Sequence, residues 1–176
     1  MKNVRQNFKS IATLGNNLTC SYFAAERYCK KSFIEMFESF EEAAKAVKDE
    51  QIEALFVPGA YPNIRFFIMD DSLVVKETAI IQIPALVLAG PFEKKPENIE
   101  KIFLHPAPER LLNEVETQYS ERIFVNSNPN ACVEVLAHKE NSIAITNDNC
   151  ARFYGLNIYK VLRPGILMPF VIFVHV

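Results

Sequence analysis

The chain has 176 residues, of which 49% are hydrophobic and 23% charged, and its formal net charge is −2. This composition is typical of a folded globular protein, and a chain of this length buries roughly 70% of the surface that its unfolded form would expose. The small net charge and the scattered Lys and Arg residues exclude a broad positive surface for nucleic acid or anionic lipid, and no apolar run is long enough to cross a bilayer.

Strand-like and helix-like segments alternate along the first part of the chain. Residues 8–14 and 33–37 are short apolar runs of strand length. Ser39 and Glu42 form a capping box that predicts the start of an alanine-rich helix, and residues 54–57 predict a buried strand. Alternation of this kind favours parallel strands that are covered by helices.

The middle of the chain predicts a crossing between two lobes. Residues 73–88 form a long segment rich in Val and Ile, broken once by Pro84, which denies a hydrogen bond to the sheet and favours a bend. The alternation then restarts, with a helix predicted from residues 105–109. Further strands are predicted at residues 102–104, 123–125, 142–146 and 168–174, and helices from residues 128 and 147. We therefore expect an α/β protein with lobe 1 at residues 1–84 and 163–176, and lobe 2 at residues 85–162.

Polar side chains occupy three predicted junctions between a strand and a helix. Ligands of open α/β sheets bind beyond the carboxyl ends of the strands, where helix N-termini offer unpaired N–H groups. The first junction carries Thr19 and Ser21, the second carries His105, and the third carries Asn126 and Ser127. Together they predict a site for a small carboxylate, although each hydroxyl could also serve as an ordinary helix cap.

The cysteines give no sign of a metal site. Cys20, Cys29, Cys132 and Cys150 lie far apart and form no Cys-x-x-Cys motif. We therefore expect no metal, no cofactor and no disulfide framework, and we expect thiols in a reducing compartment. The polar N-terminus has no signal-peptide pattern, which predicts a soluble cytoplasmic protein.

The polar junctions resemble those of the prephenate dehydratase family, in order and spacing, over about residues 10–173. Residues 12–25 resemble the opening motif of its catalytic domains, residues 105–106 its Ser-His-Pro loop, and residues 126–127 its Asn-Ser-Thr loop. Residues 143–145 and 154–156 match a later strand and helix end. The resemblance implies two lobes of the type II periplasmic-binding-protein kind, with prephenate in a cleft between them.

The chain departs from the dehydratases at the residues that carry their chemistry. Dehydratases have Thr-Arg-Phe in the last strand, where the threonine protonates the leaving hydroxyl and the arginine binds a carboxylate. Here that place holds Met168, Pro169 and Phe170, and neither Met nor Pro can donate a proton or pair with an anion. The dehydratase Glu-Asn-Ser and Pro-Glu-Gly segments are replaced by residues 57–61 and 16–18. We therefore expect the usual dehydration route to be disabled.

A second branch of the family matches these departures. The sequence is similar to the non-aromatising prephenate decarboxylases of the bacilysin and anticapsin type. The shared segments are Val-Pro-x-Ala-Tyr, His-Pro-x-Pro, Thr-Asn and Met-x-aromatic, at residues 57–61, 105–108, 146–147 and 168–170. This resemblance implies a carboxy-lyase of antibiotic biosynthesis that converts prephenate to a dihydro-hydroxyphenylpyruvate and keeps the ring hydroxyl.

The resemblance also implies roles for individual side chains. His105 or Tyr61 would supply the ring proton, because both can donate one. The substrate would be bound by Thr19, Ser21, Arg65, Asn126, Ser127, Met168 and Phe170. Two alternatives stay open, a catalytically inactive relative that binds a small carboxylate and a residual prephenate dehydratase. No nucleic-acid or membrane partner is expected, and a homodimer is left open.

Overall fold

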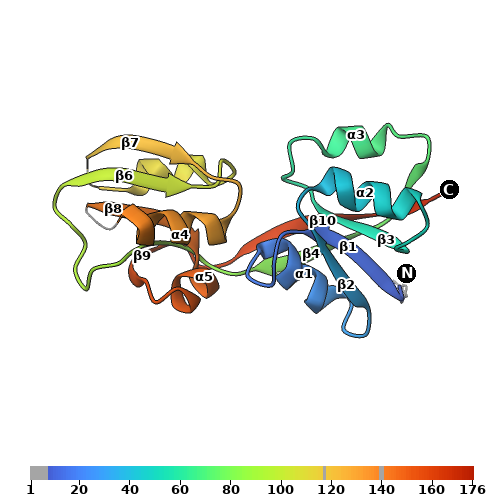
Figure 1. Ribbon diagram of the computed structural model, residues 1–176, viewed down its shortest axis with the longest axis horizontal. Coiled ribbons are helices and arrows are strands. Elements are labelled where there is room, and N and C mark those ends of the chain that lie inside the picture. Colours follow the sequence, from blue (N-terminus) through green and yellow to red (C-terminus); the bar gives the residue numbers. More distant parts are fainter. Residues whose placement is uncertain (1–7, 117, 139–140) are drawn as a thin grey trace. The chain divides into compact units, whose positions relative to one another are not determined.

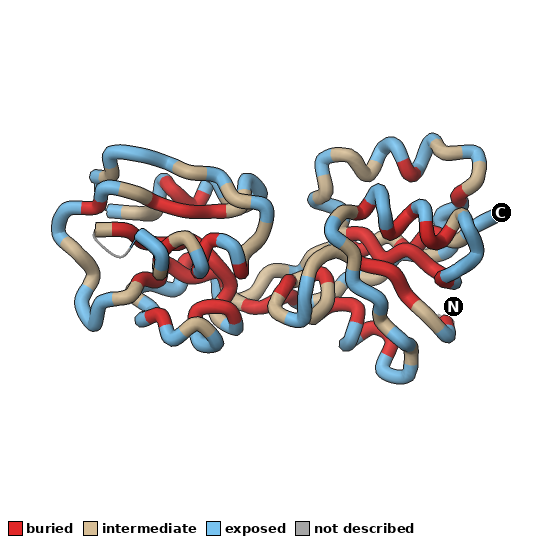
Figure 2. The backbone as a smooth tube through the Cα atoms, in the orientation of Figure 1, coloured by how far each residue is buried: buried red, intermediate tan, exposed pale blue. Residues whose placement is uncertain are grey.

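The computed structural model describes residues 8–116, 118–138 and 141–176. The chain divides into two compact units: unit 1 runs to Ile83 and resumes at Leu167–Val176, and unit 2 comprises Pro84–Ile166. Each unit has its own five-stranded sheet (Figure 1). The buried residues gather in the central strands of each sheet, whereas the outer strands are mostly exposed or half-buried (Figure 2). No helix among the described residues is long and apolar enough to cross a membrane.

In unit 1 the strands follow the order β2-β1-β3-β10-β4. The elements are β1 (Ser10–Leu14), α1 (Cys20–Tyr28), β2 (Phe33–Phe37), α2 (Phe40–Lys48), β3 (Ala54–Pro58), α3 (Ile64–Ile68), β4 (Leu73–Ile83) and β10 (Ile166–His175). Strand β1 is parallel to β2 and β3, whereas β10 is antiparallel to β3. The ends of β1, β2 and β3 therefore lie at one edge of the sheet with the beginning of β10. We call this the carboxyl edge of unit 1.

Local sequence signals account for the elements that shape this edge. Strand β3 is buried from Ala54 to Val57 because it lies between β1 and β10 in the sheet. Helix α2 begins where the Ser39 hydroxyl accepts the N–H of Glu42 at 3.1 Å, which confirms the predicted helix start at Ser39. Its alanines and Val47 face the core, while Glu41 and its other charged residues face solvent.

In unit 2 the strands follow the order β7-β6-β8-β5-β9. The elements are β5 (Leu86–Gly90), β6 (Ile99–Leu104), the 3₁₀-helix η1 (Glu109–Glu114), β7 (Tyr119–Phe124), α4 (Asn128–His138), β8 (Ser142–Asn147), α5 (Asp148–Phe153) and β9 (Asn157–Arg163). Strand β6 is parallel to β7 and β8, whereas β5 is antiparallel to β8. The ends of β6, β7 and β8 and the beginning of β5 form the carboxyl edge of unit 2.

A proline marks the passage between the units, and one predicted helix differs in type. The segment 73–88 is two strands in different sheets, because the chain leaves β4 at Ile83 and Pro84 begins the next unit. The predicted helix after His105 is the 3₁₀-helix η1, in which Leu111 N–H donates to the Pro108 carbonyl at 2.8 Å. A residue before proline avoids the α conformation, which agrees with a helix that begins only after Pro108.

Candidate functional site

The first junction of unit 1, between β1 and α1, closes tightly around Thr19. Gly15 has a φ of +95°, and its N–H donates to the Phe37 carbonyl at 2.8 Å. A Cβ on Gly15 would collide with Cγ2 of Thr19, so glycine is required both for the backbone conformation and for this contact. The Asn16 side chain accepts the N–H of Leu18 at 3.0 Å and completes the turn.

The Thr19 hydroxyl is committed to its own backbone neighbours. Its oxygen accepts the Tyr22 N–H at 3.2 Å, and its proton lies between the carbonyls of Leu14, at 3.2 Å, and Asn16, at 2.9 Å. The side chain is only 7% exposed, and Ser21 is equally buried within α1. Thr19 is therefore a helix cap in this structure, and its hydroxyl proton is directed at the backbone.

Tyr61, a predicted site residue, lies at the same edge in the loop after β3, and its hydroxyl has a partner that was not predicted. Its hydroxyl donates to Oε1 of Glu41, in the first turn of α2, at 2.6 Å. The half-buried ring packs against Phe40, with ring centres 4.7 Å apart, and against Phe67 at 6.0 Å. Burial, followed by the hydrogen bond to Glu41, raises the pKa of Tyr61 to about 12. The phenol therefore keeps its proton at neutral pH.

The beginning of β10 meets the loop after β3. The Gly59 N–H donates to the Pro169 carbonyl at 2.7 Å, and a Cβ on Gly59 would lie 3.0 Å from Cγ of Pro169. Met168 is half-buried, whereas Phe170 is 1% exposed and stacks on Phe56 with ring centres 4.7 Å apart. Phe170 therefore belongs to the core of unit 1, beneath the carboxyl edge.

Arg65 is the predicted cation of this unit. It lies in α3, is exposed, and its guanidinium is 4.9 Å from the centre of the Phe66 ring. With the residues that the structure describes it makes no ion pair.

In unit 2, His105 directly follows β6 at the carboxyl edge. Its Nδ1 accepts the Ala107 N–H at 3.2 Å, which requires that nitrogen to carry no proton. Burial lowers the pKa of His105 below its usual value of 6.5. The imidazole is therefore neutral at pH 7, and its Nε2 carries the proton.

The loop after β7 lies beside the His105 loop. The Val125 N–H donates to the Leu104 carbonyl at 3.0 Å, which joins the ends of the two strands. Asn126 is exposed, and the half-buried Ser127 accepts the Asn130 N–H at 3.3 Å. Because Ser127 uses only a lone pair in this bond, its hydroxyl can still donate to a ligand.

Buried polar groups fix the third strand of this edge. The Thr146 hydroxyl donates to the Asn128 carbonyl at 3.0 Å and accepts a hydrogen bond from the Cys132 thiol at 3.4 Å. Hydrogen bonding with Cys150, and then with Thr146, lowers the pKa of Cys132 against the opposing effect of burial. None of the four cysteines, all within the described residues, forms a disulfide. The described ranges hold no cluster of three His, Cys, Asp or Glu residues that could bind a metal.

The structure thus brings the predicted residues together in two sets. Thr19, Ser21, Tyr61 and Met168 lie along the carboxyl edge of unit 1, and His105, Asn126 and Ser127 lie along that of unit 2. Glu41, which accepts a hydrogen bond from the Tyr61 hydroxyl, joins the first set and was not predicted from the sequence. The available signal was its place in the first turn of the helix after β2, where its side chain reaches the same edge.

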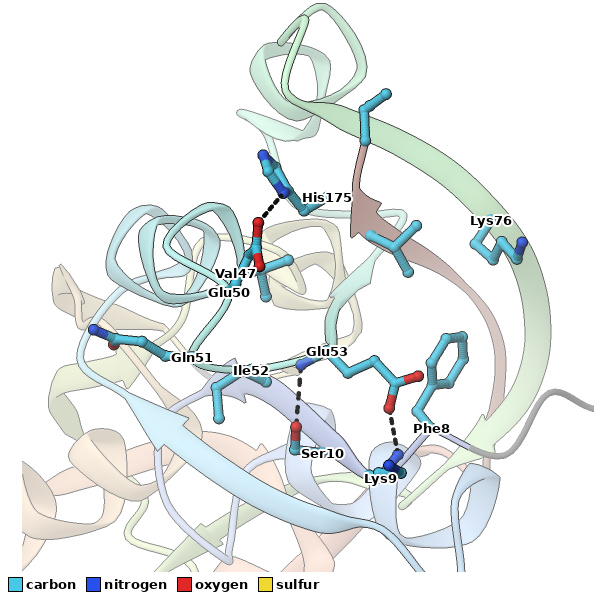
Figure 3. Close-up of a pocket in the computed structure, with 12 residues that line it drawn as sticks. Phe8, Lys9, Ser10, Val47, Glu50, Gln51, Ile52, Glu53, Lys76 and His175 are labelled. Carbon is cyan, nitrogen blue, oxygen red and sulfur yellow. Dashed lines mark hydrogen bonds and ion pairs between the residues drawn. The ribbon is translucent and has the colours of Figure 1, made fainter.

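A cavity of about 830 Å³ lies at the opposite edge of the unit 1 sheet (Figure 3). It is bordered by Phe8, Ile52, Lys76 and His175. Glu53 turns its carboxylate toward the Lys9 N–H, 2.6 Å away, so part of the lining is occupied by the protein's own hydrogen bonds. No predicted site residue lines this cavity.

Comparisons with known proteins agree with the two-unit architecture. Residues 11–162 match the family model described as prephenate dehydratase. A prephenate decarboxylase of Bacillus subtilis strain 168 is 26% identical over 168 residues, which cover 88% of this chain and 81% of that protein. A prephenate decarboxylase of Bacillus amyloliquefaciens is 25% identical over 166 residues, with the same coverage.

Among solved structures, prephenate dehydratase from Arthrobacter aurescens, in complex with L-Phe, has a TM-score of 0.72 at 16% identity. The match covers 95% of this chain, which spans only 60% of the length of that structure. The methionine binding protein MetQ has a TM-score of 0.54 at 10% identity, over 94% of this chain and 82% of that structure. Likeness at these levels of identity describes the fold, and it confirms the expected α/β class with two lobes of the periplasmic-binding-protein kind. On the match to its family model, this chain belongs to the prephenate dehydratase family.

Proposed function

We propose that the protein is a prephenate decarboxylase-like carboxy-lyase, which converts prephenate to a non-aromatic dihydro-hydroxyphenylpyruvate. The relatives named prephenate decarboxylase support this reaction over dehydration. The observation that carries the proposal is the beginning of β10, where Met168 and Pro169 offer neither a hydroxyl nor a cation. A thioether and a proline ring carry no acidic proton, so neither side chain could protonate a leaving hydroxyl.

Both reactions release CO2 and consume one proton, and they differ in whether that proton goes to a ring carbon or to the departing hydroxyl. In decarboxylation, the bond between the quaternary ring carbon and its carboxylate breaks, the electron pair enters the ring diene, and one proton is added at a distal ring carbon. In dehydration, the C–O bond breaks as well, a proton leaves with the hydroxyl as water, and the ring becomes aromatic. A site without an acid beside the hydroxyl therefore favours the first outcome.

The proposed source of the ring proton is His105 or Tyr61, and their surroundings favour His105. Tyr61 already gives its proton to Glu41. His105 has its Nε2 proton available, but proton transfer from an imidazole at useful rates requires the imidazolium form. Because burial lowers its pKa, the rate of a reaction that uses His105 as the acid should rise as the pH falls below 6.5.

Each unit by itself offers candidate donors for the carboxylates and the keto oxygen of prephenate. Ser127 keeps a hydroxyl proton for a ligand, and Arg65 keeps an exposed guanidinium. We propose that the remaining polar contacts come from Thr19, Ser21 and Asn126, and apolar contacts from Met168 and Phe170. Thr19 is hydrogen-bonded to the backbone and Phe170 is packed in the core, so these two would act by shaping the site rather than by a direct hydrogen bond to the substrate.

One observation favours a second function, a catalytically inactive relative that binds a small carboxylate. The Thr19 hydroxyl proton is used by two backbone carbonyls, which removes one donor from the first junction. A residual prephenate dehydratase is a third outcome, against which the residues at the beginning of β10 argue.

Incubation of the full chain with prephenate distinguishes these functions. The decarboxylase should release CO2 and form a pyruvyl product that is non-aromatic by NMR. Phenylpyruvate as the main product would identify a dehydratase. Prephenate that is not turned over but raises the melting temperature would identify a binding protein. Neither turnover nor stabilisation would remove prephenate as the ligand.

We infer from the same resemblance a cytoplasmic role in secondary metabolism of the bacilysin or anticapsin kind. Neighbouring genes for an amino-acid ligase or a reductase would support this pathway. A homodimer remains a prediction, and sedimentation of the purified chain would test it.

A further inference from the structure

The Tyr61–Glu41 hydrogen bond determines what Tyr61 can offer to a ligand. A phenol has one proton and two lone pairs, and Tyr61 directs that proton to Oε1 of Glu41 at 2.6 Å. The Asn63 side chain also hydrogen-bonds the phenol and lowers its pKa, which engages one lone pair of the oxygen. The oxygen can then accept one further hydrogen bond but cannot donate one. Tyr61 would therefore contact a ligand as an acceptor.

The surrounding structure holds both partners in this arrangement. The Tyr61 ring packs between Phe40 and Phe67, and its N–H donates to the Pro58 carbonyl at 2.9 Å. Glu41 is fixed by the first turn of α2, adjacent to Phe40. The phenol and the carboxylate thus come from two elements whose backbones are both anchored at the carboxyl edge of unit 1.

Electrostatic repulsion from Glu41 keeps the phenolic proton on Tyr61. Ionised Tyr61 would place a phenolate beside the Glu41 carboxylate, and two like charges at hydrogen-bond distance are unfavourable. This is one of the reasons that the pKa of Tyr61 is raised to about 12. At neutral pH, Tyr61 consequently neither loses its proton nor redirects it without breaking the bond to Glu41.

We propose, on the basis of the decarboxylase function above, that Glu41 is a positioning residue that holds Tyr61 as a hydrogen-bond acceptor for the ring hydroxyl of the substrate. A hydroxyl that donates to Tyr61 keeps its electron density on oxygen and is a poorer leaving group. Loss of water requires an added proton on that oxygen, and Glu41 prevents the nearest phenol from supplying it. Glu41 therefore favours the product that retains the hydroxyl.

Substitution of Glu41 tests this inference through the product ratio. In Glu41→Ala the Tyr61 proton is released and can protonate the leaving hydroxyl. Since a positioned general acid contributes about 10²- to 10⁴-fold, even an imperfectly placed phenol should raise the ratio of phenylpyruvate to non-aromatic product by about tenfold or more. In Glu41→Gln, whose amide oxygen can still accept the proton, the rise should be smaller. The double variant Glu41→Ala, Tyr61→Phe has no phenol and should return to the wild-type ratio.

The matched control is Glu42→Ala. Glu42 is the next residue of the same helical turn, is equally charged and exposed, and contributes to the helix cap only through its backbone N–H. A simple change in charge or in helix stability would affect both positions alike, so Glu42→Ala should leave the product ratio unchanged.

A second measurement does not depend on turnover. Ultraviolet titration of the wild type minus Tyr61→Phe isolates the tyrosinate signal of Tyr61, and in the Glu41→Ala background its pKa should fall. If the wild type forms no non-aromatic product, the decarboxylase function fails. If it does so, and the folded Glu41→Ala variant shows the wild-type product ratio and the same Tyr61 titration, the positioning role of Glu41 is overturned and the function stands.

Discussion

Replacement of Thr19 by alanine would remove the hydroxyl that closes the first junction of unit 1, and the structure sets the size of the effect. The oxygen accepts the Tyr22 N–H and donates to the carbonyls of Leu14 and Asn16. Loss of a threonine helix cap costs about 1 kcal/mol. The Cγ2 methyl beside Gly15, in a side chain that is 7% exposed, adds about 0.8 kcal/mol. Thr19→Ala should therefore lower the free energy of unfolding by about 2 kcal/mol.

Thr19→Ser separates the two contributions, because serine keeps the hydroxyl and loses only the methyl group. Thermal unfolding followed by far-ultraviolet circular dichroism measures both variants. For a chain of this length, each kcal/mol shifts the melting temperature by about 2–4 °C, so the alanine variant should melt about 4–8 °C below the wild type and the serine variant about half as far. Equal melting temperatures for the two variants would refute the reasoning, because the hydroxyl would then contribute nothing.

Two further predictions concern His105 and Gly59. Burial holds the pKa of His105 below 6.5 in the folded state, so the unfolded chain takes up this proton first as the pH falls. The free energy of unfolding should therefore be highest above pH 6.5 and should decrease from there down to the folded pKa. His105→Gln should remove that part of the pH dependence of urea unfolding between pH 7 and pH 5, and an unchanged slope would contradict the burial argument. Gly59→Ala places a Cβ 3.0 Å from Cγ and 3.2 Å from the carbonyl oxygen of Pro169, and should lower the free energy of unfolding by about 1–3 kcal/mol. The control is Ala60→Ser, at the exposed neighbour. Equal urea midpoints for Gly59→Ala and the control would show that the loop accommodates the extra Cβ without loss of stability.

The fold was predictable where a local signal decides an element. Strand β2 and helix α4 occupy the predicted residues, the first because of its apolar run and the second because Asn128 and Pro129 are typical of a helix start. Pro84 was expected to bend the long segment where it passes from one lobe to the other, and β4 and β5 lie in different sheets, but the sequence did not reveal which strands they pair with. That outcome depends on pairing between distant strands.

The candidate site was predictable in its location more than in its chemistry. The sequence shows a hydroxyl at the start of α1, but the carbonyls that take the Thr19 proton become visible only when the loop is folded. Glu41 resembles any solvent-exposed glutamate of an amphipathic helix. It meets Tyr61, 20 residues away, because β2 and β3 flank β1 and place the segments that follow them at one edge.

The placement of β10 has a consequence for the order in which the chain can fold during synthesis. Unit 2 is continuous from Pro84 to Ile166, so all of its strands have been made before Leu167 is added. The sheet of unit 1 is incomplete until β10 has been made, and until then the edge of β3 that faces away from β1 is unpaired. Domains usually fold in the order in which they are synthesised, but here the later unit can be complete first. A chain truncated before Leu167 would expose the apolar edge of β3, and an exposed strand edge is a template for aggregation.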